Sequence, residues 1–139
     1  MRHAGRTSLY APLQVLVYSS DASIRIKVQQ ALGQFPYTGT PPLDFVSIAT
    51  QPALLAEMAS GRIDLVILDA EAAPSGGIGL AKQLKDELLQ CPPVVVITAR
   101  PDDAWLADWS GADGVVCRPI DPIAIRQTVI PLLRSRLIV

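Results

Sequence analysis

The chain has 139 residues, of which 50% are hydrophobic and 18% charged, and its formal net charge is −1. This length suits one domain with a sizeable core, and the apolar content excludes a disordered chain. The charge shows no basic excess of the kind that nucleic-acid binding requires, so we do not expect a nucleic-acid partner. No apolar run reaches the roughly 20 residues of a membrane span, so we do not expect a membrane protein.

Residues 1–11 form a polar segment that we interpret as a flexible tail, followed by a single domain over residues 12–139. The tail has no apolar stretch of the kind found in a secretory signal, which favours a cytoplasmic protein. It also holds His3, the one histidine of the chain. A metal centre or catalytic triad that depends on histidine is therefore not expected.

The first half of the domain predicts two strands and two helices. Leu13–Tyr18 is an apolar strand, and the next apolar residues recur at helical spacing until Gly33, a typical stop signal. A proline-rich loop leads to a weaker strand at Phe45–Ala49, and a short helix lies between Pro52 and Gly61. The apolar face of the first helix consists of Ile24, Val28, Ala31 and Leu32.

The segment Ile63–Asp69 is the centre of the predicted fold. It contains an unbroken apolar run between Asp64 and Asp69. Runs of this kind are typical of parallel strands that are covered on both faces, whereas half-exposed strands alternate. Asp69 then stands at the carboxyl end of the strand, where doubly wound sheets place their sites.

The second half continues the alternation of strand and helix. A loop over residues 70–77 precedes a helix that ends before Pro92, and Val94–Thr98 is the next buried strand. A helix is predicted from about residue 102 to 110, and Val115–Cys117 is the last strand. The final helix begins at the cap pair Asp121–Pro122. Pro131 should kink or end that helix near Ile130.

Five strand–helix units in succession predict an α/β fold with a doubly wound, five-stranded parallel sheet. The length and the number of strands favour the flavodoxin-like strand order 2-1-3-4-5. In that order the carboxyl ends of several strands meet in one crevice. Ser19, Ser20 and Asp21 follow the first strand, and three further polar residues come from the later strands: Asp69, Thr98 and Arg118.

A carboxylate, a hydroxyl and a guanidinium at one edge could together hold a phosphoryl group. Each of the three has an ordinary explanation when taken alone. Asp69 could cap a turn, Thr98 could bond to the backbone, and Arg118 could be a solvated surface cation. Their joint occurrence at the ends of three strands favours a shared site.

These residues resemble a known family. The aspartate that ends IDLVILD, Pro74 and Gly77 behind it, the threonine that ends VVVIT, the segment 111–114 and the pair Arg118–Pro119 look like the receiver domain of response regulators. The resemblance runs from about Leu13 to the last helix. It implies a phosphoacceptor at Asp69, with Thr98 and Arg118 contacting the phosphate, and a histidine kinase or a downstream effector as the protein partner.

The chain also departs from the family pattern, which places two acidic residues after the first strand to hold Mg²⁺. Ser19 and Ser20 stand there, and Asp21 and Glu71 are the nearest acids that could substitute in part. Mg²⁺ requires hard oxygen ligands and usually carboxylates. We therefore expect weak Mg²⁺ binding, no other cofactor, and phosphorylation at Asp69 that is impaired or absent.

Two other positions of the receiver pattern also differ. Arg118 replaces the usual lysine, and its planar guanidinium could pair with unphosphorylated Asp69 and hold the site in one state. Val115 stands where the family has an aromatic switch residue. Both departures favour an atypical receiver that works through protein–protein contact.

Trp105 and Trp109 lie one turn apart on the predicted fourth helix. In one interpretation, one of them fills the core and the other covers its edge. In the other, they form with Val115 a contact surface, and receivers resemble one another in using their fourth and fifth helices for such contacts, including dimers. The apolar residues after Leu132 also favour an interface.

Two hypotheses follow. The first is an atypical stand-alone receiver of a phosphorelay, without enzymatic activity. The second is a flavodoxin-like domain that binds phosphate or FMN, with the serines after the first strand as phosphate ligands and a tryptophan stacked on the ring. That turn lacks the glycine that close backbone approach to a phosphate usually requires.

Overall fold

The computed structural model describes residues 11–36 and 39–137, so all but the last residue of the predicted tail lies outside the described part. The elements alternate as predicted, and a short 3₁₀ turn precedes the fourth helix. In chain order they are β1 (Leu13–Tyr18), α1 (Ala22–Leu32), β2 (Leu43–Ile48), α2 (Gln51–Ala59), β3 (Leu65–Asp69), α3 (Gly77–Glu87), β4 (Val94–Thr98), η1 (Pro101–Asp103), α4 (Ala104–Trp109), β5 (Gly114–Cys117) and α5 (Pro122–Ser135).

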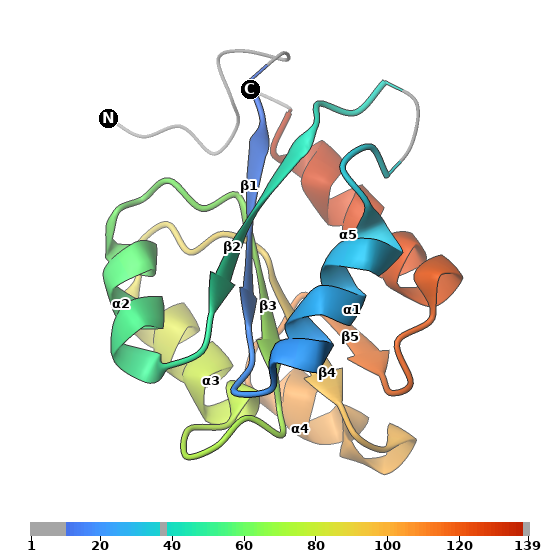
Figure 1. Cartoon of the computed structure of the whole chain (residues 1–139). Helices are drawn as coiled ribbons and strands as arrows, with labels where there is room; N and C mark the ends of the chain where they lie inside the picture. Colours follow the sequence, from blue (N-terminus) through green and yellow to red (C-terminus); the bar gives the residue numbers. More distant parts are fainter. Residues whose placement is uncertain (1–10, 37–38, 138–139) are drawn as a thin grey trace.

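The five strands form one sheet in the order β2-β1-β3-β4-β5, and every neighbouring pair is parallel. This confirms the predicted architecture and strand order. Figure 1 shows α1 and α5 on one face of the sheet and α2 and α3 on the other. A parallel sheet needs both faces covered, because each crossover helix packs onto the sheet it leaves.

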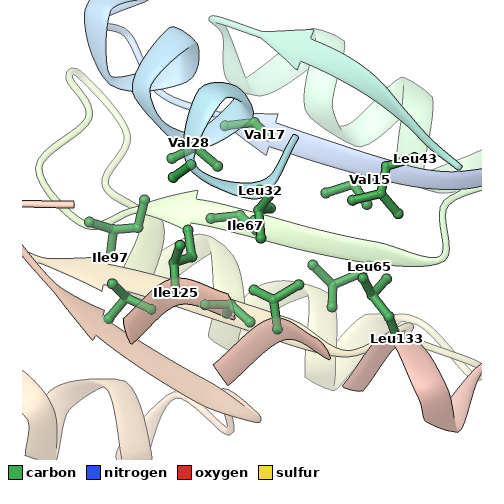
Figure 2. Close-up of a cluster of buried hydrophobic side chains, with 14 of the residues drawn as sticks. Val15, Val17, Val28, Leu32, Leu43, Leu65, Ile67, Ile97, Ile125 and Leu133 are labelled. Atoms are coloured by element: carbon green, nitrogen blue, oxygen red, sulfur yellow. The ribbon is translucent and has the colours of Figure 1, made fainter. Parts of the chain in front are cut away.

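The hydrophobic core is divided by the sheet into two clusters. One cluster joins inward residues of the strands to α1 and α5, and Figure 2 shows Val28 and Leu32 of α1 with Ile125 and Leu133 of α5 against Ile67. The other cluster joins the opposite strand residues to α2, α3 and α4. All five residues of β3 are buried, which explains the unbroken apolar run in its sequence.

Two predicted boundaries differ from the structure. β2 begins at Leu43 instead of Phe45 and ends at Ile48, because its backbone pairs with β1 from Leu13 onward. Of the kink or end that the sequence predicted near Ile130, the end is wrong, since α5 continues to Ser135 with Pro131 inside it. The kink stays a prediction. Pro131 is exposed, and the fully buried Leu133 in the next turn anchors the rest of the helix to the core.

Both tryptophans lie at the surface, where Trp105 is 67% and Trp109 59% exposed. The interpretation in which one of them fills the core is therefore wrong. The small Ala107 between them is the residue of α4 that is buried. No helix in the described part of the chain is long and apolar enough to cross a bilayer.

Candidate functional site at the carboxyl edge of the sheet

The predicted site residues lie at one edge of the sheet because all five strands run in the same direction. Ser19 directly follows β1, Asp69 ends β3 and Thr98 ends β4. Arg118 directly follows β5, and its backbone N–H donates to the carbonyl of Thr98 at 2.8 Å. Residues from four distant segments are thereby brought to the carboxyl ends of the neighbouring strands β1, β3, β4 and β5.

Asp69 is the centre of this site and is only 1% exposed. Nη2 of Arg118 lies 2.7 Å from Oδ1 and 2.7 Å from Oδ2 of Asp69. The Ser19 hydroxyl donates to Oδ2 at 2.7 Å, and the backbone N–H of Glu71 donates to Oδ1 at 2.9 Å. Both carboxylate oxygens therefore already have charged or polar partners, as a buried charge requires.

The two serines after β1 hold different parts of the site. Ser19 is fully buried and also accepts from the backbone N–H of Asp21 at 2.9 Å, so its hydroxyl connects the turn after β1 to Asp69. Ser20 is exposed, and its hydroxyl accepts from the backbone N–H of Ala73 at 3.0 Å. The two hydroxyls thus link the end of β1 to the last residue of β3 and to the loop that follows it.

The two nearby acids, Asp21 and Glu71, make no side-chain hydrogen bond with Asp69 among the described residues. Asp21 is the N-cap of α1, and its carboxylate accepts from the backbone N–H of Ser23 at 2.9 Å and from the Ser23 hydroxyl at 2.8 Å. The Ser23 hydrogen bonds, and in smaller measure the charge of Arg118, lower the pKa of Asp21. Glu71 contributes its backbone N–H to Asp69 and is itself exposed. That either acid substitutes in part for the acids of the family pattern stays a prediction.

Thr98 reaches the predicted edge, but its side chain does not join the Asp69–Arg118 pair. It is fully buried, and its hydroxyl has no hydrogen-bond partner among the described residues. Nε of Arg118 is likewise buried without an acceptor in the described part of the chain. Buried polar atoms without partners are uncommon in folded proteins.

The loop between β3 and α3 is held in place by a residue that sequence reasoning missed. Tyr18, the last residue of β1, is 1% exposed, and its hydroxyl donates to the carbonyl of Ser75 at 2.7 Å. The Ser75 hydroxyl in turn donates to Gln51 of α2 at 2.6 Å. Burial and the charge of Asp69 raise the pKa of Tyr18. A tyrosine at the end of an apolar strand was the available signal, since a buried phenol usually needs a partner.

Gly77 explains how α3 begins so close to the site. A Cβ at this position would lie 2.7 Å from the carbonyl oxygen and 2.8 Å from the carbonyl carbon of Asp69. Any side chain would therefore collide with backbone atoms of β3. The glycine that carries part of the receiver resemblance is required here by direct contact between the helix start and the strand end.

The predicted contact surface divides in the structure. Trp109 lies beside α3, where the ammonium group of Lys82 is 5.8 Å from the centre of its ring. Val115 is half-buried and packs against the cluster that contains Ala107. The exposed aromatic residues therefore belong to α4 and lie beside α3, whereas Val115 packs against the core.

Comparison with known proteins identifies the family. The chain is 51% identical over 123 residues to proteins described as uncharacterized response regulatory proteins from two strains of Mycobacterium tuberculosis, covering 88% of this chain and 92% of each relative. No family model matches the sequence.

Solved structures of the same fold include three receivers at low sequence identity. The signal receiver domain of a putative LuxO repressor protein from Vibrio parahaemolyticus has a TM-score of 0.76 at 20% identity and covers 91% of this chain and 95% of that one. The chemotaxis response regulator CheY4 of Vibrio cholerae gives 0.71 at 21% identity, over 88% of this chain and 99% of that one. The BeF3-activated DrrB receiver domain gives 0.71 at 19% identity, over 89% and 99%.

Fold and edge geometry together define a receiver-type module. The chain belongs to the response regulators of two-component signalling, and it is a receiver domain and not an enzyme.

Proposed function

We propose that this receiver signals in the cytoplasm through protein–protein contact, with phosphorylation of Asp69 impaired or absent. The observation that carries this proposal is the contact of Arg118 with both carboxylate oxygens of the buried Asp69. A carboxylate attacks phosphorus through an unshared oxygen lone pair. An aspartate whose oxygens are held by a guanidinium, a hydroxyl and an amide is a weaker nucleophile.

The metal that receivers employ does not fit the residues at this edge. Mg²⁺ would need oxygen ligands beside Asp69, and usually at least one further carboxylate. Ser19 directs its proton toward Asp69, and Ser20 accepts from a backbone amide. No group of three or more acidic, histidine or cysteine side chains suited to a metal exists among the described residues. Arg118 supplies the positive charge that balances the buried Asp69 carboxylate.

The test is a reaction of the protein with acetyl phosphate and Mg²⁺, followed by intact mass spectrometry. We expect no phosphoryl adduct on the natural chain. The matched variant carries Ser19→Asp, Ser20→Asp and Arg118→Lys, which restores both acids and the point charge of a lysine. This variant should gain an adduct that disappears when Asp69→Ala is added. An adduct on the natural chain that Asp69→Ala removes would overturn the proposal of impaired phosphorylation.

The alternative of a flavodoxin-like ligand site has no observation in its favour. The serine hydroxyls that would hold a phosphate are bonded to Asp69 and to the amide of Ala73. The tryptophan that would stack on a ring instead lies beside α3. A lack of tryptophan quenching by FMN would agree with this assignment.

The partner of the receiver is a protein, either a histidine kinase or a downstream effector. We propose that it contacts the exposed aromatic residues of α4, because two large apolar side chains at helical spacing are exposed there without a structural role in the core. A homodimer through α4 and α5 is a second form that such a contact could take. Analytical ultracentrifugation of the natural chain and of Trp109→Ala distinguishes the two forms.

A further inference from the structure

The exposed surface of α3 and α4 combines aromatic and acidic side chains. Trp105 and Trp109 are 67% and 59% exposed and lie four residues apart, which places them on one side of the helix. Tryptophan is among the residues most enriched in the energetically dominant positions of protein interfaces. Two exposed tryptophans on a helix of six residues are therefore a strong sign of binding.

Three cations of α3 and of the turn before α4 each have an acid within ion-pair distance. Nζ of Lys82 lies 2.7 Å from Asp86, and Nζ of Lys85 lies 2.7 Å from Asp113. A third pair joins Arg100 to Asp103 at 3.4 Å. Each of these cations thus has an acidic neighbour within the chain.

Two carboxylates remain beside the tryptophans after this pairing. Asp102 and Asp108 are exposed, and neither has an ion pair among the described residues. Each lies three residues from Trp105, one before it and one after it, and residues at this spacing are neighbours on a helical surface. Trp105 is thus flanked by negative charge on both sides.

The contact of Lys82 with Trp109 shows which chemistry the indole rings accept. The ammonium group stands over the ring at 5.8 Å from its centre, the geometry of a cation–π interaction. Trp105 has no such cation among the described residues, although it is the more exposed ring. A cation from outside the chain would find both a ring face and two carboxylates there.

We propose that this surface, defined by Trp105, Trp109, Asp102 and Asp108, binds an apolar segment of a partner protein that carries arginine or lysine. The inference rests on the proposed function in so far as protein contact is the output of the receiver. A second copy of the chain is the less suitable occupant. A two-fold dimer would place the same acidic surface against itself, and like charges across an interface oppose association.

The chain offers a direct readout of binding, because it contains only two tryptophans and both lie on this surface. The probe is a synthetic peptide of three Arg-Leu-Pro repeats, and its control is the same peptide with glutamate in place of arginine. We expect a saturable change of tryptophan emission with the cationic peptide and none with the acidic one. The affinity should fall as NaCl is raised, since exposed charges are screened.

The charge dependence is tested by a double variant, Asp102→Asn with Asp108→Asn. It should weaken binding of the cationic peptide by about fivefold, the effect of losing two exposed ion pairs. Glu57→Gln removes an acid from α2 as the matched control and should leave the affinity unchanged. Far-UV circular dichroism verifies that both variants are folded.

Three results would overturn the inference. They are equal responses to the cationic and acidic peptides, an unchanged affinity in the double aspartate variant, and a concentration-dependent dimer whose formation shifts the tryptophan emission. The assay with acetyl phosphate is independent of this surface. A phosphoryl adduct on the natural chain would overturn the impaired site while leaving the peptide result valid.

Discussion

Two buried aspartates lie at opposite ends of β3, and each is paired with an arginine. Asp64 directly precedes the strand, accepts from the backbone N–H of Gln14 at 2.8 Å and lies 3.7 Å from Nη2 of Arg136. Asp69 ends the strand and lies 2.7 Å from Nη2 of Arg118. Both aspartates are 1% exposed.

The difference lies in what supplies the partners. Asp64 accepts from the backbone of β1 and is paired with Arg136, the residue that follows α5. Its carboxylate therefore connects β1, β3 and the end of α5. Asp69 is held by Ser19 and Arg118, which are side chains of the turns after β1 and β5. The same chemistry therefore joins regular elements at the start of β3 and occupies the carboxylate oxygens of Asp69 at its end. The following variants test that contrast, from the largest expected effect to the smallest.

Replacement of Asp64, which precedes β3, should have the largest effect on stability. Asp64→Ala leaves the Gln14 amide without its acceptor and removes the buried carboxylate that lies 3.7 Å from Arg136, and we expect a loss of about 3 kcal/mol in the free energy of unfolding. Asp64→Asn keeps an oxygen acceptor and should lose less. Urea unfolding at a constant slope measures both. Equal losses in the two variants would contradict the role assigned to the amide contact.

Replacement of Arg118 should have a smaller effect on stability. Its side chain is 28% exposed, so water can reach Asp69 once the guanidinium is removed. We expect Arg118→Met to lower the unfolding free energy by about 2 kcal/mol. Asp69→Asn combined with Arg118→Met should lose about 1 kcal/mol less than the sum of the single variants. Strict additivity in this cycle would show that the two side chains do not interact.

The close contact between α3 and β3 gives a matched pair of glycine variants. Gly77→Ala places a methyl group against the backbone of Asp69 and should cost about 2 kcal/mol. Gly79→Ala lies in the same helix with nothing within 4 Å of the new Cβ, and it should stabilise the protein by about 0.5 kcal/mol. Thermal unfolding of the two variants should shift in opposite directions. A shift in the same direction would remove the steric explanation for Gly77.

The smallest effect concerns Tyr18 and depends on pH. Tyr18→Phe removes the hydrogen bond to Ser75 and should cost about 1 kcal/mol near neutral pH. The pKa of Tyr18 is raised above its ordinary value of 10.0 in the folded protein. Its contribution is therefore fully present below pH 10 and declines as the pH rises toward the folded pKa.

The gap in stability between the natural chain and Tyr18→Phe should accordingly narrow above pH 10. Unfolding curves at neutral and alkaline pH measure it. A gap that widens with pH would mean that the folded state favours the tyrosinate, against the burial of this side chain.

Much of the site could be predicted because a parallel sheet brings all strand ends to one edge. The position of Asp69, Ser19 and Arg118 followed from the alternation of strands and helices, and the structure joins these three side chains. The separate roles of Asp21 and Glu71 could not be predicted. Whether an acid caps a helix or faces a site depends on the direction of a single turn, which composition and spacing do not define.

For the tryptophans of α4, too, the sequence predicted part of the arrangement and left part open. The spacing of Trp105 and Trp109 predicted a shared side of the helix but not its exposure. Ala107 is the residue that α4 buries, and the position of α3 decides that Lys82 lies over Trp109. A hydrophobic residue in a short helix does not by itself reveal which face of the helix meets the core.

The sequence by itself determined the order of the elements, the parallel sheet and the edge at which polar residues gather, because apolar periodicity and turn residues act over a few neighbouring positions. Only the tertiary structure decided which oxygen each hydrogen-bond donor meets. Arg118 bonds to Asp69 and Thr98 does not, because contacts between segments some fifty residues apart depend on the packing of the whole sheet and not on local pattern.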